Sequence, residues 1–428
     1  MFKALLAASA ALLVANPALA QGAGPYDAAV FEKARTLQPK VVAWRRDVHQ
    51  NPELGNREFR TSKLVAEHLK KLGFEVRTGV AKTGVVGVLK GGKPGGVVAL
   101  RADMDGLPVE ERTGLPFASK AKGEYNGQTV SVMHACGHDA HVAILMGAAE
   151  LLASMRADIP GTVVVLFQPA EEGAPAGEEG GASVMIREGA LKNPAPTAIF
   201  GLHVKPGPVG ELAWRPGPMM AASDRFEVAL KGKQTHGAMP WEGIDMASMT
   251  ADVITAFNQI AARQVNVAKF PTVLTIGMIQ GGMRHNIIPE DLQMAGTLRT
   301  FDTGMRKDVM ARMAKATASI ADRYGAEATL TWSGTPNPVT TNDRPLTERM
   351  KPTLMRAAPG KARDDLDYIT GAEDFSYYQQ QIPGLFYDLA AGNPPGVNHS
   401  PFFTIDEAAL EVGVRAQALL ALDYLSSR

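Results

Sequence analysis

Five short and almost continuous apolar runs recur along the chain, and each predicts a strand that is buried on both faces of a sheet. They lie at residues 84–89, 97–100, 162–167, 198–204 and 385–391. Such runs are typical of parallel sheets with both faces covered. Patterns of helical period lie between and after them, at residues 61–72, 138–155 and 407–425. This alternation of strands and helices predicts an α/β domain built on a mostly parallel sheet.

The hydrophobic pattern changes in the middle of the chain, where strands alternate in polarity as half-exposed strands do. The predicted order there is strand, helix, strand, strand, helix, strand, at residues 224–230, 246–263, 272–279, 292–300, 306–324 and 326–332. This order is the ferredoxin-like α+β pattern. We therefore predict an inserted domain over 218–334, between two parts of a larger catalytic domain at 21–217 and 335–428, with Gly217 and Gly334 as candidate hinges.

The first twenty residues have the features of an export signal. Lys3 precedes an apolar stretch at 4–15, and residues 18–20 form an A-x-A cleavage site. A buried helix or a membrane anchor is the alternative, but the stretch is shorter than the ~20 residues that span a bilayer. We expect a signal peptide over 1–20, a mature chain from Gln21, a periplasmic or secreted location, and no membrane association after cleavage.

Composition and charge narrow the class of protein. Hydrophobic residues make up 45 % and charged residues 21 % of the 428, which is typical of a globular chain. The 44 basic residues equal the 44 acidic ones, so overall charge gives no reason to expect nucleic acid as a partner. Cys136 is the one cysteine, which excludes an intramolecular disulfide and calls for another explanation in an exported protein.

The densest group of polar residues is MHACGHDAH at 133–141. Cysteine and histidine are ligands that suit Zn²⁺. By itself the group is a weak signal, because neighbouring residues cannot all face one ion. A buried cysteine at a helix start, with histidines at the surface, is an equally good interpretation.

Other polar residues follow the predicted strands and strengthen the metal interpretation. Asp103, the pair Glu171 and Glu172, and His203 each follow a buried strand, and His399 follows the loop after the last strand. In open α/β sheets, ligands bind beyond the carboxyl ends of the strands. We therefore expect these side chains to converge on one site.

The residue types then suggest roles. The five ligands expected for two divalent ions that share a bridging ligand are Cys136, His138, Glu172, His203 and His399. Zinc is the first choice, and manganese, cobalt or nickel could serve. Glu171, beside a ligand, is the natural general base. Asp103 could orient a ligand histidine, although Asp103 and Asp105 could instead be turn residues that cap their own backbone.

The motifs together resemble the dinuclear-metal aminoacylase and carboxypeptidase family of metallopeptidases. The sequence is most similar to the branch of hippurate hydrolases, N-acyl-amino-acid amidohydrolases and auxin-conjugate (IAA-amino acid) hydrolases. The segments that carry the resemblance span the mature chain: RRDVH at 45–49, RADMDGLP at 101–108, MHACGHDAH at 133–141, QPAEEG at 168–173, GLHVKP at 201–206, GAEDF at 371–375 and NHSP at 398–401. The resemblance implies a zinc-peptidase-like catalytic domain with the same five ligands and the same base.

The resemblance also implies functions for the inserted domain, which corresponds to a lid and dimerisation domain in a homodimer. His236, in THGAMP at 235–240, is expected to polarise the scissile carbonyl, in some relatives across the dimer interface. Asn286 and Arg299 match positions that hold the carboxylate end of the substrate. Without the resemblance, His236 would be an ordinary loop histidine and Arg299 an exposed strand charge.

The sequence therefore predicts a metal-dependent amidohydrolase that cleaves small-molecule N-acyl or N-aroyl amino acids. Glu171 would take a proton from a water held at the metal site. A dipeptidase or carboxypeptidase with the same site is the alternative. Asn51, Asn56, Arg57 and residues 335–343 depart from the branch, which leaves the substrate open.

Two rival classes fit less well. A serine hydrolase of the penicillin-recognising type would use SKAK at 119–122 and KTG at 82–84, but the two motifs stand in reverse order. A non-catalytic solute-binding protein would also be two-lobed and exported. Such a protein needs no base beside a metal ligand, which argues against this class.

Overall fold

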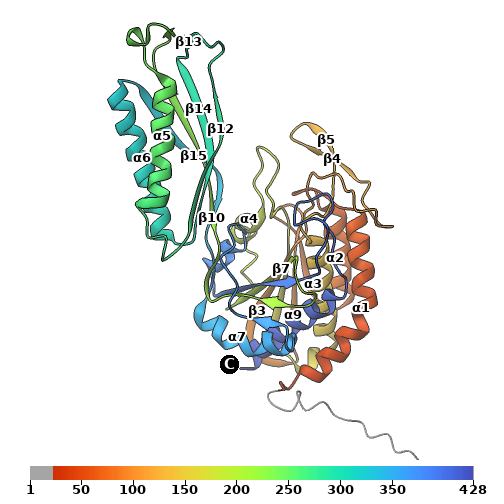
Figure 1. Cartoon of the computed structure of the whole chain (residues 1–428). Coiled ribbons are helices and arrows are strands. Elements are labelled where there is room, and N and C mark those ends of the chain that lie inside the picture. The colour runs from red at the N-terminus through yellow and green to blue at the C-terminus, as the bar shows by residue number, and fades with distance from the viewer. Residues whose placement is uncertain (1–22, 428) are drawn as a thin grey trace, which may run out of the picture.

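The computed structural model describes residues 23–427, and its larger domain is built on an eight-stranded sheet (Figure 1). In spatial order the strands are β1 (Glu75–Val80), β2 (Gly84–Lys90), β6 (Pro160–Gln168), β3 (Lys93–Asp103), β7 (Ile199–Lys205), β18 (Gly384–Ala390), β8 (Leu212–Ala213) and β17 (Ala362–Arg363). The central strands β6, β3, β7 and β18 are parallel to one another. The predicted mostly parallel sheet is confirmed.

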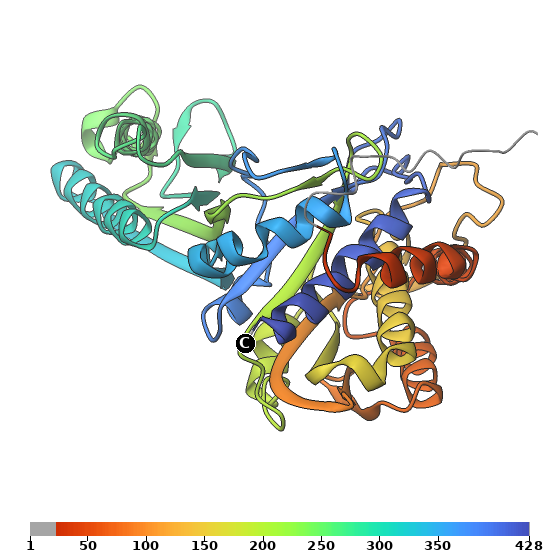
Figure 2. The ribbon, with the colours of Figure 1, turned by 90° about the horizontal axis from the view of Figure 1, so that it is seen from below.

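Helices cover both faces of this sheet. In β6, Val163, Val165 and Phe167 belong to one buried cluster and Val164 and Leu166 to another, as the two-residue period of a strand requires. The first cluster packs under helices α1 (Asp27–Gln50), α2 (Phe59–Lys71), α3 (His138–Ser154), α7 (Arg344–Ala357) and α9 (Ala409–Ser426). The second packs under the shorter α4 (Gly181–Arg187) and α8 (Ser376–Gln379). Figures 1 and 2 show α1, α3 and α9 together on one side.

Helices α1 and α7 are not among the predicted elements. Each contains an internal proline, Pro39 in α1 and Pro352 in α7. An internal proline removes a backbone hydrogen bond and disfavours a helix in the sequence pattern. Both helices pack on α9, so tertiary burial outweighs the local cost.

The inserted domain has the predicted ferredoxin-like order. Its antiparallel sheet runs β12 (Thr272–Gly281), β14 (Asp291–Thr300), β10 (Ala222–Lys231) and β15 (Glu327–Asn337). Helices α5 (Met246–Arg263) and α6 (Thr303–Tyr324) cover one face of it (Figure 1). Phe226 of β10 packs against Phe257 of α5 and Trp332 of β15, so the domain has a core of its own.

The two connections to the inserted domain lie side by side. Strand β9 (Gly217–Met220) precedes the domain, β16 (Thr340–Asn342) follows it, and the two pair antiparallel. Gly217 and Gly334 both have left-handed backbone conformations, with φ of 82° and 78°. The chain thus enters and leaves through one two-stranded connection, while the domain boundaries and hinges stay predictions.

Two short antiparallel strand pairs complete the fold. Strands β11 (Thr235–His236) and β13 (Ile287–Ile288) pair at the end of the inserted domain that points away from the main sheet (Figure 1). Strands β4 (Lys122–Tyr125) and β5 (Gln128–Ser131) form a hairpin on the larger domain.

The predicted signal peptide, residues 1–20, lies outside the described residues. Export and cleavage at Gln21 therefore stay predictions. Over residues 23–427, no helix combines the length and the apolar character needed to cross a membrane.

Candidate metal centre

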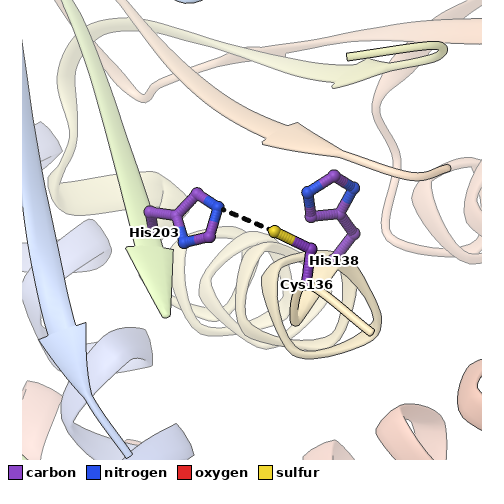
Figure 3. A group of neighbouring side chains, drawn as sticks. All are labelled: Cys136, His138 and His203. Carbon is purple, nitrogen blue, oxygen red and sulfur yellow. Dashed lines mark hydrogen bonds between the residues drawn. The ribbon is translucent and has the colours of Figure 1, made fainter. Parts of the chain in front are cut away.

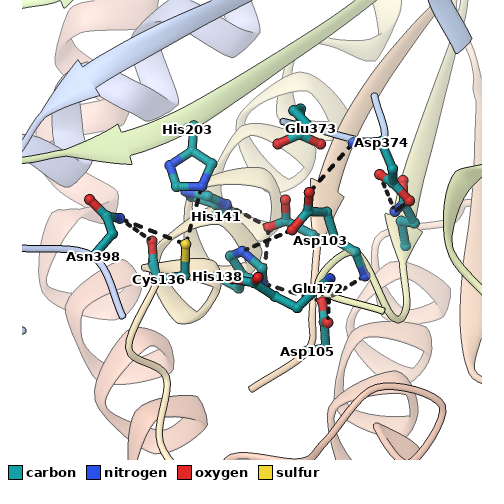
Figure 4. A network of polar contacts seen from close by, with 12 residues as sticks. Asp103, Asp105, Cys136, His138, His141, Glu172, His203, Glu373, Asp374 and Asn398 are labelled. Atoms are coloured by element: carbon teal, nitrogen blue, oxygen red, sulfur yellow. Dashed lines mark hydrogen bonds and ion pairs between the residues drawn. The ribbon is translucent and has the colours of Figure 1, made fainter. Parts of the chain in front are cut away.

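Three neighbouring parallel strands deliver polar side chains to one end of the main sheet, as the sequence predicts. Asp103 and Gln168 are the last residues of β3 and β6 and stand in register with each other. His203 lies in β7, two residues before its end, instead of just beyond the strand. Pro169 follows β6 at once, so Glu171 and Glu172 lie in the loop beyond that strand. Figure 4 shows how the side chains of Asp103, Glu172 and His203 converge.

Cys136, His138 and His203 form the first group of possible ligands (Figure 3). Cys136 Sγ lies 3.4 Å from His203 Nε2, and His138 is the first residue of α3. The donor atoms of the three residues lie within 4.8 Å of one another. Two donors of a tetrahedral zinc ion, one sulfur and one nitrogen, would stand about 3.5 Å apart. The observed distance fits such an ion.

One ring nitrogen of His203 and one of His138 face this group and can act as ligands. His203 donates from Nδ1 to the Val204 carbonyl at 2.8 Å, which leaves the lone pair of Nε2 toward Cys136. His138 points Nδ1 at Asp105 Oδ1, 3.3 Å away. Its Nε2 is buried and has no hydrogen-bond partner among residues 23–427. A buried nitrogen without a partner is costly, and a cation would satisfy it.

Cys136, Glu172 and His399 form a second group, which shares Cys136 with the first. His399 Nε2 lies 2.9 Å from Glu172 Oε1. The His399 backbone is left-handed, with φ of 71°, and its N–H donates to the Ala135 carbonyl at 2.7 Å. Because both groups contain the same sulfur, the donor set suits two ions with a bridging thiolate.

Electrostatics around these donors favour bound positive charge. Burial holds the pKa of His203 well below its usual range, so the ring is neutral and able to ligate. Hydrogen bonds to Cys136 and Glu172 raise the pKa of His399 to about 10. For His138, burial alone would lower the pKa, but Asp103, Asp105 and Cys136 together raise it. In the absence of an ion, protons are drawn to the two rings that face anionic donors.

Glu171 lies beside both groups. Its side chain is 8 % exposed, and its Oε2 lies 3.9 Å from His138 Nε2. Burial, followed by the charges of Glu373 and Glu172, raises its pKa well above the usual range. Glu171 also falls in a third group of possible ligands, with His138 and Glu172. Its position therefore suits either a base or a ligand, while its raised affinity for a proton is the property of a base.

Asp105 is a site residue that sequence reasoning left as a possible turn aspartate. Its carboxylate accepts the backbone N–H groups of Glu171, at 3.1 Å, and of Glu172, at 3.0 Å. It is also the carboxylate nearer to His138. Asp103 lies 3.8 Å from the Nδ1 of His138 and makes its close contact, 2.5 Å, with His141 Nδ1. The Asp-x-Asp pair after a buried strand was the only signal in the sequence.

Arg101 is a second residue that the sequence analysis did not single out. Its guanidinium is fully buried and pairs with Asp103 at 2.5 Å, Glu373 at 2.9 Å and Asp374 at 2.8 Å. It also donates to Gln168 Oε1 at 2.9 Å. An arginine at the end of an apolar strand run was the available signal.

The structure does not bring His236 and Asn286 to this centre within one copy of the chain. His236 is exposed in β11, and its Nδ1 accepts the Ala238 N–H at 3.0 Å. Asn286 lies beside it, accepting the Gly237 N–H at 2.9 Å through its backbone carbonyl. Arg299 lies near the other end of the domain, in β14, where burial lowers its pKa.

Comparison with known proteins places the chain in a family. The family model described as "Peptidase family M20/M25/M40" matches residues 99–423. A thermostable carboxypeptidase 2 of Saccharolobus solfataricus is 40 % identical over 91 % of this chain and 96 % of that protein. An N-acetyl-L-cysteine deacetylase of Bacillus subtilis is 40 % identical over 88 % of this chain and 86 % of that protein. An IAA-amino acid hydrolase ILR1-like 2 of Arabidopsis thaliana is 36 % identical over 96 % of this chain and 92 % of that protein.

A solved structure agrees. The YXEP protein of Bacillus subtilis, described as a dinuclear metal binding peptidase from the M20 family, superposes with a TM-score of 0.78. It is 36 % identical, over 92 % of this chain and 100 % of that one. The resemblance stated from the motifs is confirmed. This chain belongs to peptidase family M20/M25/M40 and is a metal-dependent hydrolase of that family.

Proposed function

We propose that this enzyme hydrolyses the amide bond of N-acyl or N-aroyl amino acids, releasing a free amino acid and a carboxylic acid. The observation that carries the proposal is the pair of three-residue donor groups that share Cys136, with Glu171 beside them. Relatives named for deacetylation of N-acetylcysteine and for hydrolysis of IAA-amino acids support this substrate class.

The proposed ligands of two divalent ions are Cys136, His138, Glu172, His203 and His399. Zinc suits a donor set with one thiolate and three imidazoles best, and manganese, cobalt or nickel are the alternatives. When bound, such ions polarise a carbonyl oxygen and lower the pKa of a water.

Glu171 is the proposed general base. Its buried carboxylate accepts a proton from the attacking water and then gives it to the nitrogen of the leaving amine. Asp105 holds the peptide N–H groups of both Glu171 and Glu172, so the base and its neighbour keep a constant separation. Asp103 holds His141, whose Nε2 accepts the backbone N–H of Val204 beside His203. Asp103 thereby steadies the end of β7 that carries a proposed ligand.

The substrate is proposed to lie between the metal centre and the linkers of the inserted domain. A polar cavity of about 420 Å³ is found there, lined among others by Glu171, Glu178, Ser183, Gly334, Asn337 and Tyr377. Arg299, on the nearer end of the inserted sheet, is proposed to hold the carboxylate of the amino-acid part. Closure of the inserted domain about Gly217 and Gly334 would bring it to the substrate.

A homodimer is the proposed way to complete the site. His236 and Asn286 lie at the end of the inserted domain that points away from their own metal centre (Figure 1). Strand β12 is an edge of its sheet and carries exposed Val273, Met278 and Ile279. An exposed apolar edge strand is a surface that a second copy can cover. We propose that His236 of one subunit stabilises the oxyanion in the other.

The residues before the described part support a proposed location. The charged start, the short apolar stretch and the A-x-A site at 18–20 are the pattern of a cleaved export signal. We propose a periplasmic or secreted enzyme.

Carboxypeptidase or dipeptidase action is the second candidate, supported by the thermostable carboxypeptidase relative. The two candidates share the metal centre and differ in the group on the acyl side. A panel of N-acetyl, N-benzoyl and N-indolylacetyl amino acids, with dipeptides alongside, separates them. Release of a free amino acid from the acyl compounds, abolished by a chelator, is the expected result. Turnover of dipeptides alone would favour the second candidate.

Replacing the base tests the assignment of Glu171. Glu171→Gln is expected to lower kcat by about 10² to 10⁴-fold while the bound metal, measured by mass spectrometry of the eluted ions, stays unchanged. Loss of metal together with activity would identify Glu171 as a ligand instead.

The shared sulfur can be tested by its effect on metal content. Cys136→Ser removes a donor common to both groups, so one or both ions should be lost and activity with them. His285→Ala, at an exposed histidine of the inserted domain, is the matched control and should keep both metal ions. Undiminished metal in Cys136→Ser would exclude the bridging role.

Mixed dimers test whether His236 acts across the interface. Chains with Glu171→Gln and chains with His236→Ala are each expected to be inactive. After the two are unfolded and refolded together, half of the dimers are mixed and each has one complete site, so about a quarter of wild-type activity should return. If His236 acts within its own chain, mixing restores nothing.

A further inference from the structure

The loop that carries Glu171 and Glu172 accepts support from Glu58, a buried residue outside the metal centre that hydrogen-bonds the loop backbone. Glu58, fully buried before α2, accepts the backbone N–H of Ala170 at 2.8 Å through Oε1. Its Oε2 accepts the hydroxyl of Thr83 at 2.6 Å, and Thr83 is buried as well. Glu58 stands at the N-cap position of α2, yet its side chain makes no capping bond to that helix. Its hydrogen bonds go to the loop and its neighbour.

Ala170 has a backbone conformation that alanine rarely adopts. Its φ is 50°, in the left-handed region, where a Cβ is crowded. The side chain is buried and packed so closely that a Cβ added at Gly55 or Gly180 would lie 3.1 or 2.9 Å from its own. Residues that keep such a conformation are held by their surroundings and cluster at functional sites. Reversal of the chain here lets the two following glutamates both turn toward the metal centre.

The same three residues that matched a serine-hydrolase motif support this loop. Thr83 holds Glu58, Lys82 pairs with Glu178 at the far end of the loop, and a Cβ on Gly84 would come within 3.1 Å of Pro169. Asn56 and Arg57, which depart from the family branch, also bind Glu178, at 3.1 and 2.7 Å. In the other serine-hydrolase motif, SKAK at 119–122, the hydroxyl of Ser119 donates to the Val132 carbonyl. The KTG turn therefore supports the loop of the metal centre.

We propose that Glu58, fixed by Thr83, is a positioning residue that keeps Ala170 in its left-handed conformation and so aims Glu171 and Glu172 into the metal centre. The proposal rests on the proposed function for the roles of those two glutamates. Together with Asp105, Glu58 holds three successive backbone N–H groups, those of residues 170, 171 and 172. In this proposal, Glu58 acts through the oxygen that accepts the Ala170 N–H, and its negative charge is not required.

A charge-neutral variant separates these properties. Burial, followed by the charge of Asp105, raises the pKa of Glu58 to about 8, so a neutral side chain is readily accommodated at this position. In Glu58→Gln, the amide carbonyl accepts from Ala170 and the amide NH₂ faces Thr83, so activity should stay within about threefold of wild type. In Glu58→Leu, the acceptor is lost and kcat should fall by about 10 to 100-fold. Thr83→Val, which keeps the shape, should act in the same direction.

A second substitution tests the backbone conformation itself. Glycine adopts left-handed φ without a steric cost. In an Ala170→Gly background, the loss of kcat caused by Glu58→Leu should therefore be smaller, by about fivefold. A general packing defect at Glu58 would not be relieved by that change.

Hydrogen exchange gives a readout that needs neither metal nor substrate. In the metal-free chain, the Ala170 amide should be protected in wild type and Glu58→Gln, and exchange at least about tenfold faster in Glu58→Leu and Thr83→Val. Equal protection in all four would overturn the proposal, as would equal loss of activity in Glu58→Gln and Glu58→Leu. If Glu58→Leu does not fold, Thr83→Val decides. If the wild-type enzyme shows no chelator-sensitive turnover, the proposed function is contradicted. The exchange experiment still tests whether Glu58 holds the Ala170 amide, because it requires no activity.

Discussion

The end of the main sheet depends on the buried guanidinium of Arg101. Three carboxylates from two segments of the chain, that of Asp103 in the same strand and those of Glu373 and Asp374 about 270 residues away, meet it within 2.9 Å. Without a cation among them, three buried like charges would repel one another, and each would pay the cost of leaving water. The arginine therefore joins β3 to the segment after the inserted domain. Glu171 lies close to this cluster, since the charges of Glu373 and Asp374 are among the causes that raise the pKa of that glutamate.

This balance leaves negative charge in excess on the other side of the site. Asp105, Glu171 and Glu172 lie near Cys136 and three histidines, and they do not pair with Arg101. In a buried site, such an excess is met by protonation or by bound cations. The high proton affinity of Glu171 and His399 shows how strongly the site attracts positive charge. A pair of divalent ions is the partner that the donors themselves indicate.

The division into two domains separates the metal centre from the residues that we propose to contact the substrate. The larger domain holds every proposed metal ligand on loops and strand ends of a rigid sheet. The inserted domain carries His236, Asn286 and Arg299 at two opposite ends, and it joins the larger one through the paired strands β9 and β16. A narrow connection of this kind allows the domain to move as a unit.

The sequence by itself determined five strands of the main sheet, the strand and helix order of the inserted domain, the loop position of Glu171 and Glu172, and the convergence of the proposed ligands, because apolar period and strand ends are local properties. Tertiary structure decided the rest. Helices α1 and α7 form despite internal prolines because they are buried against α9. Asp105, Arg101 and Glu58 acquired roles only through contacts with residues far away in sequence, as did Asn56 and Arg57. Hydrogen bonds and ion pairs between distant segments leave no periodic trace in the chain, so only the folded structure shows them.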